Sequence, residues 1–204
     1  MFARTLAPLH RDVNIEDLIY VVDDEKKKRR RWQPGIKWQE TSNALLLRSS
    51  PIQGLGVFSA GYIPANSIIL YYTGEEIRPT VADVRERRMI DRLTQLNLAN
   101  VSDNAENVHA SPSMYMFRRG DDVIIDSTNA GNIARFVNHS CEPNCEAKDV
   151  PNLHGKRRIV FKSLRDIMPG EELGYDYKMA PEHPDDRIVC SCGAKNCKKF
   201  MNGD

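Results

Sequence analysis

The stretch Asn138-His139-Ser140-Cys141-Glu142-Pro143-Asn144-Cys145 decides how the rest of this chain is interpreted. It follows the segment 133–137, Ile-Ala-Arg-Phe-Val, whose apolar spacing predicts a short helix. Proline and asparagine are typical of turns, so the simplest interpretation is a surface turn after that helix. Such a turn leaves the two cysteines unexplained, and their partners have to be sought elsewhere in the chain.

A second group of thiols lies near the C-terminus, in Cys190-Ser191-Cys192-Gly193-Ala194-Lys195-Asn196-Cys197. Three thiols in one short loop need a fourth ligand to complete a tetrahedral zinc site. Cys190 and Cys192 are too close in sequence to form an easy disulfide, but both can reach one ion. Because most of the cysteines fit a metal set, we expect a reducing, intracellular compartment.

Composition favours a soluble, globular chain of about one large domain. The sequence has 204 residues, of which 41% are hydrophobic and 28% charged. Its net charge of +1 gives no overall field that would recruit nucleic acid or an anionic membrane. No apolar run is long enough to cross a bilayer, and the N-terminus lacks the apolar core of a secretory signal.

The pattern of short apolar runs predicts a mainly β fold with short helices. Runs bounded by Gly, Pro or Asn predict strands at 44–47, 57–59, 67–72, 114–118, 123–126 and 157–163. The clearest helix is predicted at 80–93, with Asp83 in its first turn and a partial apolar stripe of Val81, Val84, Met89 and Leu93. Three arginines of this helix, Arg85, Arg87 and Arg88, are interpreted as a solvated face.

Three segments are predicted outside the β core. Residues 1–42 form an N-terminal extension whose basic run, 26–31, is either an import or nucleic-acid signal or a solvated charge run with no reader. Residues of about 80–113 form a helical and flexible insert within a domain of residues 43–178. Residues 186–204 form a separate C-terminal segment that carries the thiol loop.

Two further motifs complete the pattern: Gly54-Leu55-Gly56, and Glu172-Leu173-Gly174-Tyr175-Asp176-Tyr177, where the two tyrosines share one strand face. Taken in order with the Asn-His pair and the thiols, they resemble the SET-domain lysine methyltransferases. The resemblance implies small curved sheets around a pseudoknot, followed by a zinc-bound post-SET loop. It also implies four zinc ligands, Cys141, Cys190, Cys192 and Cys197, and it leaves Cys145 as a small packed residue.

The resemblance assigns the remaining site residues. S-adenosylmethionine is the implied cofactor, and the implied binding set is Gln53, Leu55, Tyr115, Asn138, His139 and Ser191. Tyr177 stands at the position of the catalytic tyrosine, with Tyr115 as a second wall of the lysine channel. Tyr175 stands where Tyr or Phe sets the number of methyl groups added. Taken alone, a glycine turn, a buried histidine or a buried tyrosine is more often structural.

Within the family, the segments 115–118, 135–145 and 192–202 are most similar to the trithorax and COMPASS-type enzymes. That branch implies lysine 4 of histone H3 as the target, a histone tail or nucleosome as the partner, COMPASS-type scaffold subunits, and a nuclear, chromosome-associated location. Gly174 departs from the threonine usual in this branch.

Three alternatives stay open. The first is a catalytically silent SET module that only binds. The second is a methyltransferase for another histone lysine or for a non-histone protein. The third, a nucleic-acid-binding zinc protein that uses residues 26–31, fits poorly with the near-zero net charge and the thiol spacing, although the sequence leaves direct DNA binding open.

Overall fold

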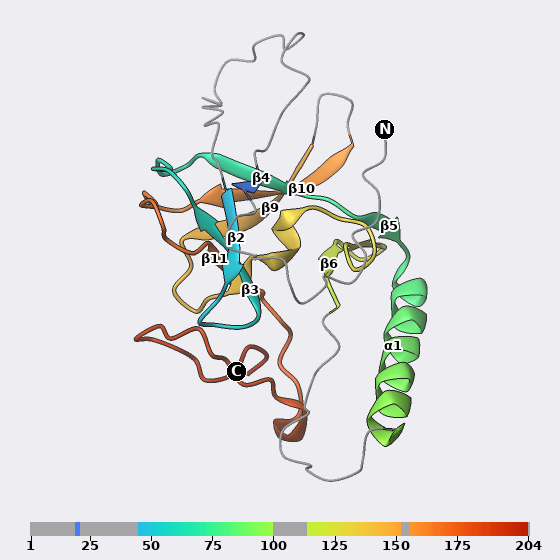
Figure 1. Ribbon diagram of the computed structural model, residues 1–204. Coiled ribbons are helices and arrows are strands. Elements are labelled where there is room, and N and C mark those ends of the chain that lie inside the picture. The colour runs from blue at the N-terminus through green and yellow to red at the C-terminus, as the bar shows by residue number, and fades with distance from the viewer. Residues whose placement is uncertain (1–18, 21–44, 100–113, 152–155, 204) are drawn as a thin grey trace. The chain divides into compact units, whose positions relative to one another are not determined.

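The computed structural model describes residues 19–20, 45–99, 114–151 and 156–203 (Figure 1). The basic run at 26–31 and residues 100–113 of the predicted insert lie outside these ranges, as does all of the predicted extension except Ile19 and Tyr20. The contacts divide the chain into two compact units. One is Thr73–Arg135, and the other combines Leu6–Tyr72 with Phe136–Asp204.

Three small sheets build the described part of the second unit. In the first, β1 (Ile19–Tyr20), β2 (Leu45–Ser49) and β3 (Leu55–Ser59) pair antiparallel in that order. In the second, β10 (Arg157–Ser163) lies antiparallel between β4 (Ile68–Tyr72) and β9 (Cys145–Pro151). In the third, β8 (Asn138–His139) and β11 (Gly174–Tyr175) pair in parallel. The strands predicted near 45, 57, 68 and 157 are confirmed.

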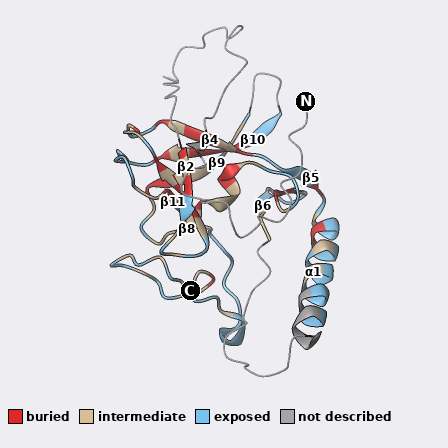
Figure 2. Cartoon of the chain, in the orientation of Figure 1, coloured by how far each residue is buried: buried red, intermediate tan, exposed pale blue. Residues whose placement is uncertain are grey.

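The core of this unit is centred on β10. Three consecutive residues, Ile159, Val160 and Phe161, are at most 2% exposed, because the strand is paired on both edges and covered on both faces. Buried side chains from the other segments complete the core: Leu45, Val57, Ile63, Leu70, Val137, Ile167 and Leu173. Figure 2 shows this burial concentrated in the strands.

The unit Thr73–Arg135 contains one sheet and one long helix. β7 (Val123–Asp126) lies between β5 (Glu75–Ile77) and β6 (Met116–Arg119), antiparallel to both. The turn between β6 and β7 passes through Gly120, whose positive φ of 68° suits a glycine. Helix α1 runs from Pro79 to Ala99, six residues beyond the predicted end at Leu93.

The predicted apolar stripe of α1 is wrong for the residues whose side chains are described. Val81 and Val84 are 41% and 39% exposed, whereas Ala82 is 4% exposed and packs with Ile77 and Ile124. Figure 2 shows most of the helix exposed. The first turn holds no acidic residue, so Asp83 lies just beyond the place predicted for it.

An ion pair supplies what the apolar stripe does not. Arg85, interpreted from the sequence as part of a solvated face, places Nη1 2.6 Å from Asp126 Oδ2 and Nη2 2.8 Å from Glu75 Oε2. Asp126 is 2% exposed. Burial opposes ionisation of Asp126, but hydrogen bonds from Thr128 and Arg85 hold the pKa of its carboxyl below the usual value.

The described residues are therefore mostly strands with one α-helix, which confirms the mainly β class. Two short 3-10 helices, η2 (Ile133–Phe136) and η3 (Pro184–Asp186), complete the elements. In the described part of the chain, no helix is long and apolar enough to cross a membrane.

Candidate functional site

The Asn138–Cys145 stretch enters the core of its unit through β8. Parallel pairing places Asn138 opposite Gly174 and His139 opposite Tyr175, so the polar pair and the tyrosine segment lie side by side. A Cβ on Gly174 would lie 2.9 Å from the Ser140 Cβ. The small residue at 174 therefore permits the close approach of the two segments.

Asn144, in the turn of this stretch, fixes the tyrosine segment from below. Its side chain is buried, and its Oδ1 accepts a 2.9 Å hydrogen bond from the Gly174 amide. Its Nδ2 donates to the Glu172 carbonyl at 2.7 Å. The sequence gave no reason to treat Asn144 as more than a turn residue, because both partners are about 30 positions away.

His139 links the thiols to Tyr177. Its Nδ1 accepts a hydrogen bond from the Tyr177 amide at 3.2 Å, so Nε2 carries the proton and faces Cys141 Sγ at 3.4 Å. Burial lowers the pKa of His139; Asp176 acts against this shift and Lys198 adds to it. The imidazole is thus neutral at pH 7 and acts here as an orienting group.

The two tyrosines of the β11 segment lie against each other. Their ring centroids are 4.7 Å apart, and Tyr175 also packs edge-on against Phe161 at 4.8 Å. Tyr177 donates its hydroxyl to the Val137 carbonyl at 3.1 Å. Burial raises the pKa of Tyr175 well above its usual value, so this phenol stays neutral. The predicted shared face is confirmed, although β11 itself has only two residues.

Four thiols meet beside these residues. The Sγ atoms of Cys141, Cys190, Cys192 and Cys197 all lie within 4.8 Å of one another, and Cys141 and Cys190 are 3.7 Å apart. Tetrahedral zinc with bonds of about 2.3 Å requires sulfur atoms about 3.8 Å apart, which these thiols approach. Cys145 lies apart from the cluster, fully buried, with its thiol on the Gly174 carbonyl.

The thiols differ in acidity. Burial raises the pKa of Cys190 to about 12. Burial acts on Cys192 too, but hydrogen bonds to its sulfur from the Cys141 and Ala194 amides and from neighbouring thiols lower its pKa to about 7. The cluster therefore stabilises a thiolate, which is the form that binds a metal.

The tail that carries three of the thiols is held by a buried asparagine. Asn202 is 1% exposed; its Nδ2 donates to Glu182 Oε2 at 2.7 Å, and its Oδ1 accepts from the Ile188 amide at 2.6 Å. An isolated bridge pairs Val189 with Phe200. The loop therefore folds back on itself and presents residues 189–192 to the core.

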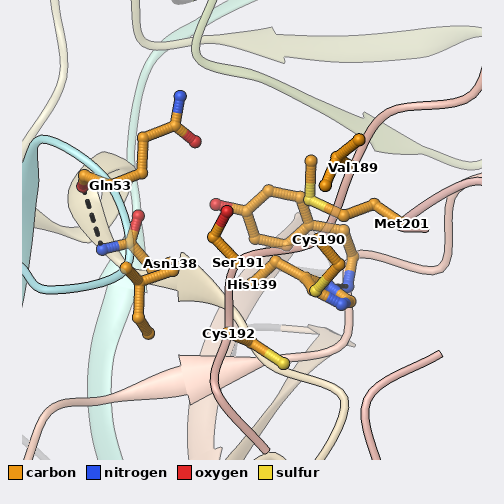
Figure 3. A pocket seen from close by; sticks show the side chains of 10 residues that line it. Gln53, Asn138, His139, Val189, Cys190, Ser191, Cys192 and Met201 are labelled. Carbon is orange, nitrogen blue, oxygen red and sulfur yellow. Dashed lines mark hydrogen bonds between the residues drawn. The ribbon is translucent and has the colours of Figure 1, made fainter. Parts of the chain in front are cut away.

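A pocket lies between the core segments and this tail (Figure 3). Gln53 and Asn138 stand on one side of it, and Val189 and Met201 on the other. Its empty space is about 300 Å³, part of it open to solvent. Ten residues line it: Ile52, Gln53, Asn138, His139, Tyr177, Val189, Cys190, Ser191, Cys192 and Met201.

The pocket gathers most of the predicted cofactor set. Gln53, Asn138, His139 and Ser191 line it, while Leu55 contributes a backbone carbonyl that accepts from Asn138 Nδ2 at 3.1 Å. Tyr115 belongs to the other unit, where its ring lies 5.4 Å from the Arg135 guanidinium carbon.

Sequence reasoning missed three apolar lining residues, Ile52, Val189 and Met201. Each lies next to a predicted residue or thiol, and that proximity was the available signal. It also missed Glu172, whose Oε1 accepts from Asn138 Nδ2 at 2.8 Å.

Comparison with known proteins agrees with this arrangement. The SET domain family matches residues 54–178. A Saccharomyces cerevisiae protein named "Histone-lysine N-methyltransferase, H3 lysine-4 specific" is 37% identical over 197 residues, which is 88% of this chain and 17% of that protein. A Schizosaccharomyces pombe protein of the same name is 43% identical over 153 residues, or 75% of this chain and 14% of that protein.

A Drosophila melanogaster protein named "Histone-lysine N-methyltransferase trr" is 37% identical over 164 residues, 80% of this chain and 6% of that protein. The chain thus spans less than a fifth of the length of each of these relatives.

Proposed function

Because this chain belongs to the SET-domain family, we propose that it is a protein-lysine methyltransferase that uses S-adenosylmethionine and acts on lysine 4 of histone H3. The observation that carries the proposal is the pocket in which Asn138, His139 and Tyr177 face the thiol loop. The printed names of the relatives support the choice of substrate. The corresponding location is chromatin in the nucleus.

We assign the predicted set to the cofactor. Gln53, Asn138, His139 and Ser191 line the pocket and would hold S-adenosylmethionine there, with Leu55 contributing backbone. When bound, S-adenosylmethionine supplies a methyl group on a sulfonium, a good leaving group. Tyr115 stays a proposed member of both the cofactor set and the lysine channel.

The tyrosine pair suits a lysine acceptor. Transfer needs a neutral amine, and lowering a lysine from a pKa of about 10.4 to neutrality at pH 7 costs about 4–5 kcal/mol. Burial beside a cation supplies such a shift. The rings of Tyr175 and Tyr177, 4.7 Å apart, can hold the amine by cation–π attraction.

In this assignment Tyr177 is the catalytic tyrosine. Its hydroxyl is fixed on the Val137 carbonyl, so both oxygens keep a set position next to the amine. Neither a strong base nor an ionised phenol is required, because positioning alone can contribute about 7–11 kcal/mol in well-oriented systems. Tyr175 would limit the number of methyl groups added.

We assign the four thiols to one structural zinc ion. Cys141 comes from the core stretch, and Cys190, Cys192 and Cys197 come from the tail. The donor set is the soft, thiolate-rich one that zinc prefers at closed structural sites. Zinc would then hold the tail that forms one wall of the pocket.

The test is methyl transfer from labelled S-adenosylmethionine to histone H3, read by mass spectrometry. We expect label on wild-type H3, none on H3 with lysine 4 substituted, and about a hundredfold lower kcat for Tyr177→Phe, as expected for a misaligned acceptor. Tyr62→Phe is the matched control, because Tyr62 is 50% exposed and does not line the pocket.

Three outcomes would count against the proposal. Label that persists on the lysine-4-substituted H3 would move the target to another lysine. Full activity of Tyr177→Phe would overturn its catalytic role. If H3 stays blank in the presence of COMPASS-type scaffold subunits while calorimetry detects cofactor binding, the substrate is another protein.

A further inference from the structure

Glu172 lies behind the pocket wall with a fixed carboxylate. Its Oε1 accepts from Ser50 Oγ at 2.8 Å, and its Oε2 accepts from the same hydroxyl at 3.1 Å. Ser50 Oγ in turn accepts from the Ile52 amide at 2.9 Å, so its single proton is directed at Glu172. Gly56 leaves room for this seat, because a Cβ there would lie 2.2 Å from Glu172 Oε1.

This carboxylate determines how the Asn138 amide is oriented. Asn138 Nδ2 faces Glu172 Oε1 at 2.8 Å, the Leu55 carbonyl at 3.1 Å and the Gln53 carbonyl at 3.4 Å. All three are oxygen acceptors, so a side-chain oxygen in that place would be repelled. Nδ2 therefore stays on this side (Figure 3), and Oδ1 is turned away from it.

The surroundings of Asn138 favour a positively charged donor. None of the described residues that line the pocket is Lys, Arg, Asp or Glu. The formal charge hydrogen-bonded to Asn138 is the Glu172 carboxylate, and the nearby main-chain groups are carbonyls. A ligand group that donates hydrogen bonds and carries positive charge matches this wall, whereas an anionic group does not.

We propose that Glu172 is a positioning residue that orients the Asn138 carboxamide so that Oδ1 accepts a hydrogen bond from the α-ammonium group of the bound cofactor. This inference rests on the proposed function, because the ammonium belongs to the amino-acid arm of S-adenosylmethionine. Glu172 itself acts through Asn138, which touches the ligand.

The test compares two ligands that differ in that ammonium alone. S-adenosylhomocysteine carries it, and 5′-S-(3-carboxypropyl)-5′-thioadenosine has hydrogen in its place. Calorimetry with the full chain is expected to show wild-type preference for the amine-bearing ligand of about tenfold to a hundredfold, the range of one charge-assisted hydrogen bond. In Glu172→Ala this preference is expected to fall to about one, with binding of the deamino ligand unchanged.

Two further variants keep the test decisive. Glu172→Gln retains an acceptor for Asn138 Nδ2 and is expected to lose less of the preference than Glu172→Ala; equal losses would show that charge, and not positioning, is what matters. Glu171→Gln is the matched control, because its hydrogen-bond partners Asn144, Arg165 and Met168 do not line the pocket. It is expected to keep the wild-type ratio.

The outcomes separate the two levels of the argument. A wild-type chain that binds neither ligand contradicts the proposed function itself. A wild-type chain that binds both ligands equally, or a folded Glu172→Ala that keeps the wild-type ratio, overturns the role of Glu172 and leaves the proposed function standing. Thermal unfolding of each variant establishes that it is folded.

Discussion

At the scale of single residues, Gly56 links backbone packing to ligand binding. We predict that Gly56→Ala weakens binding of S-adenosylhomocysteine by about tenfold, the loss of one hydrogen bond's worth of free energy. The added Cβ would lie 2.2 Å from Glu172 Oε1 and 3.0 Å from Ser50 Cβ, so the carboxylate has to leave its seat and release Asn138. Calorimetry measures the affinity.

Gly61→Ala is the matched control for this change. An ideal Cβ at Gly61 meets nothing within 4 Å, and its φ is not in the left-handed region. We expect it to keep wild-type affinity and to change stability by less than about 1 kcal/mol. Equal affinities in the two variants would show that the close approach at Gly56 has no bearing on the pocket.

The residues that could be predicted from the sequence are those inside short motifs. Gln53, Asn138, His139 and Ser191 were chosen because each sits next to a glycine turn or a thiol, and all four line one pocket. Glu172 and Asn144 were not, since their roles arise from partners 34 and 30 positions away along the chain. No local pattern distinguishes such residues from ordinary surface or turn residues.

At the scale of elements, helix α1 depends on a charged anchor. We predict that Arg85→Ala lowers the free energy of unfolding by about 2 kcal/mol at pH 7, less than for a fully buried pair because Arg85 is partly exposed. It would leave the Asp126 carboxylate, 1% exposed in its side chain, without its cation. Urea unfolding followed by circular dichroism measures the loss, with exposed Arg88→Ala as control.

The pH dependence of this loss has a defined sign. The folded-state pKa of Asp126 lies below its usual 3.8, so the ion pair contributes stability above that value and loses it as pH falls through the folded-state pKa. The difference between wild type and Arg85→Ala is therefore complete at pH 7 and shrinks as acid protonates Asp126. A difference that stays constant into acid would assign the loss to packing instead.

Elements with a strong local pattern were predictable, and those made by pairing were not. β10 was predicted at its observed bounds because Gly, Pro and polar residues frame its apolar run. The extension of α1 to Ala99 was not, since residues 94–99 lack the apolar period on which the boundary was based. Strands β8 and β11 have two residues each and exist through their parallel pairing.

At the scale of the whole molecule, the pocket and the thiol cluster depend on the same chain crossing. Residues 52–53, 138–139 and 177 form one part of the pocket, and residues 189–192 with Met201 form the other. Cys141 joins the core stretch to the three tail thiols within 4.8 Å. The resemblance of the motifs predicted this meeting of distant segments, whereas composition and periodicity alone did not.

This crossing makes metal removal a test of pocket integrity. We predict about one zinc per chain by elemental analysis, and loss of zinc in Cys197→Ser, because three thiols leave a tetrahedral site incomplete. Chelation is expected to weaken S-adenosylhomocysteine binding by about tenfold or more, since the tail wall loses its tether while the core wall stays folded. Cys145→Ala is the matched control: Cys145 is buried outside the cluster, on the Gly174 carbonyl, so its loss should cost about 1 kcal/mol of stability and no zinc. Zinc content that is unchanged in Cys197→Ser, or cofactor affinity that survives complete chelation, would separate the thiol cluster from the pocket it borders.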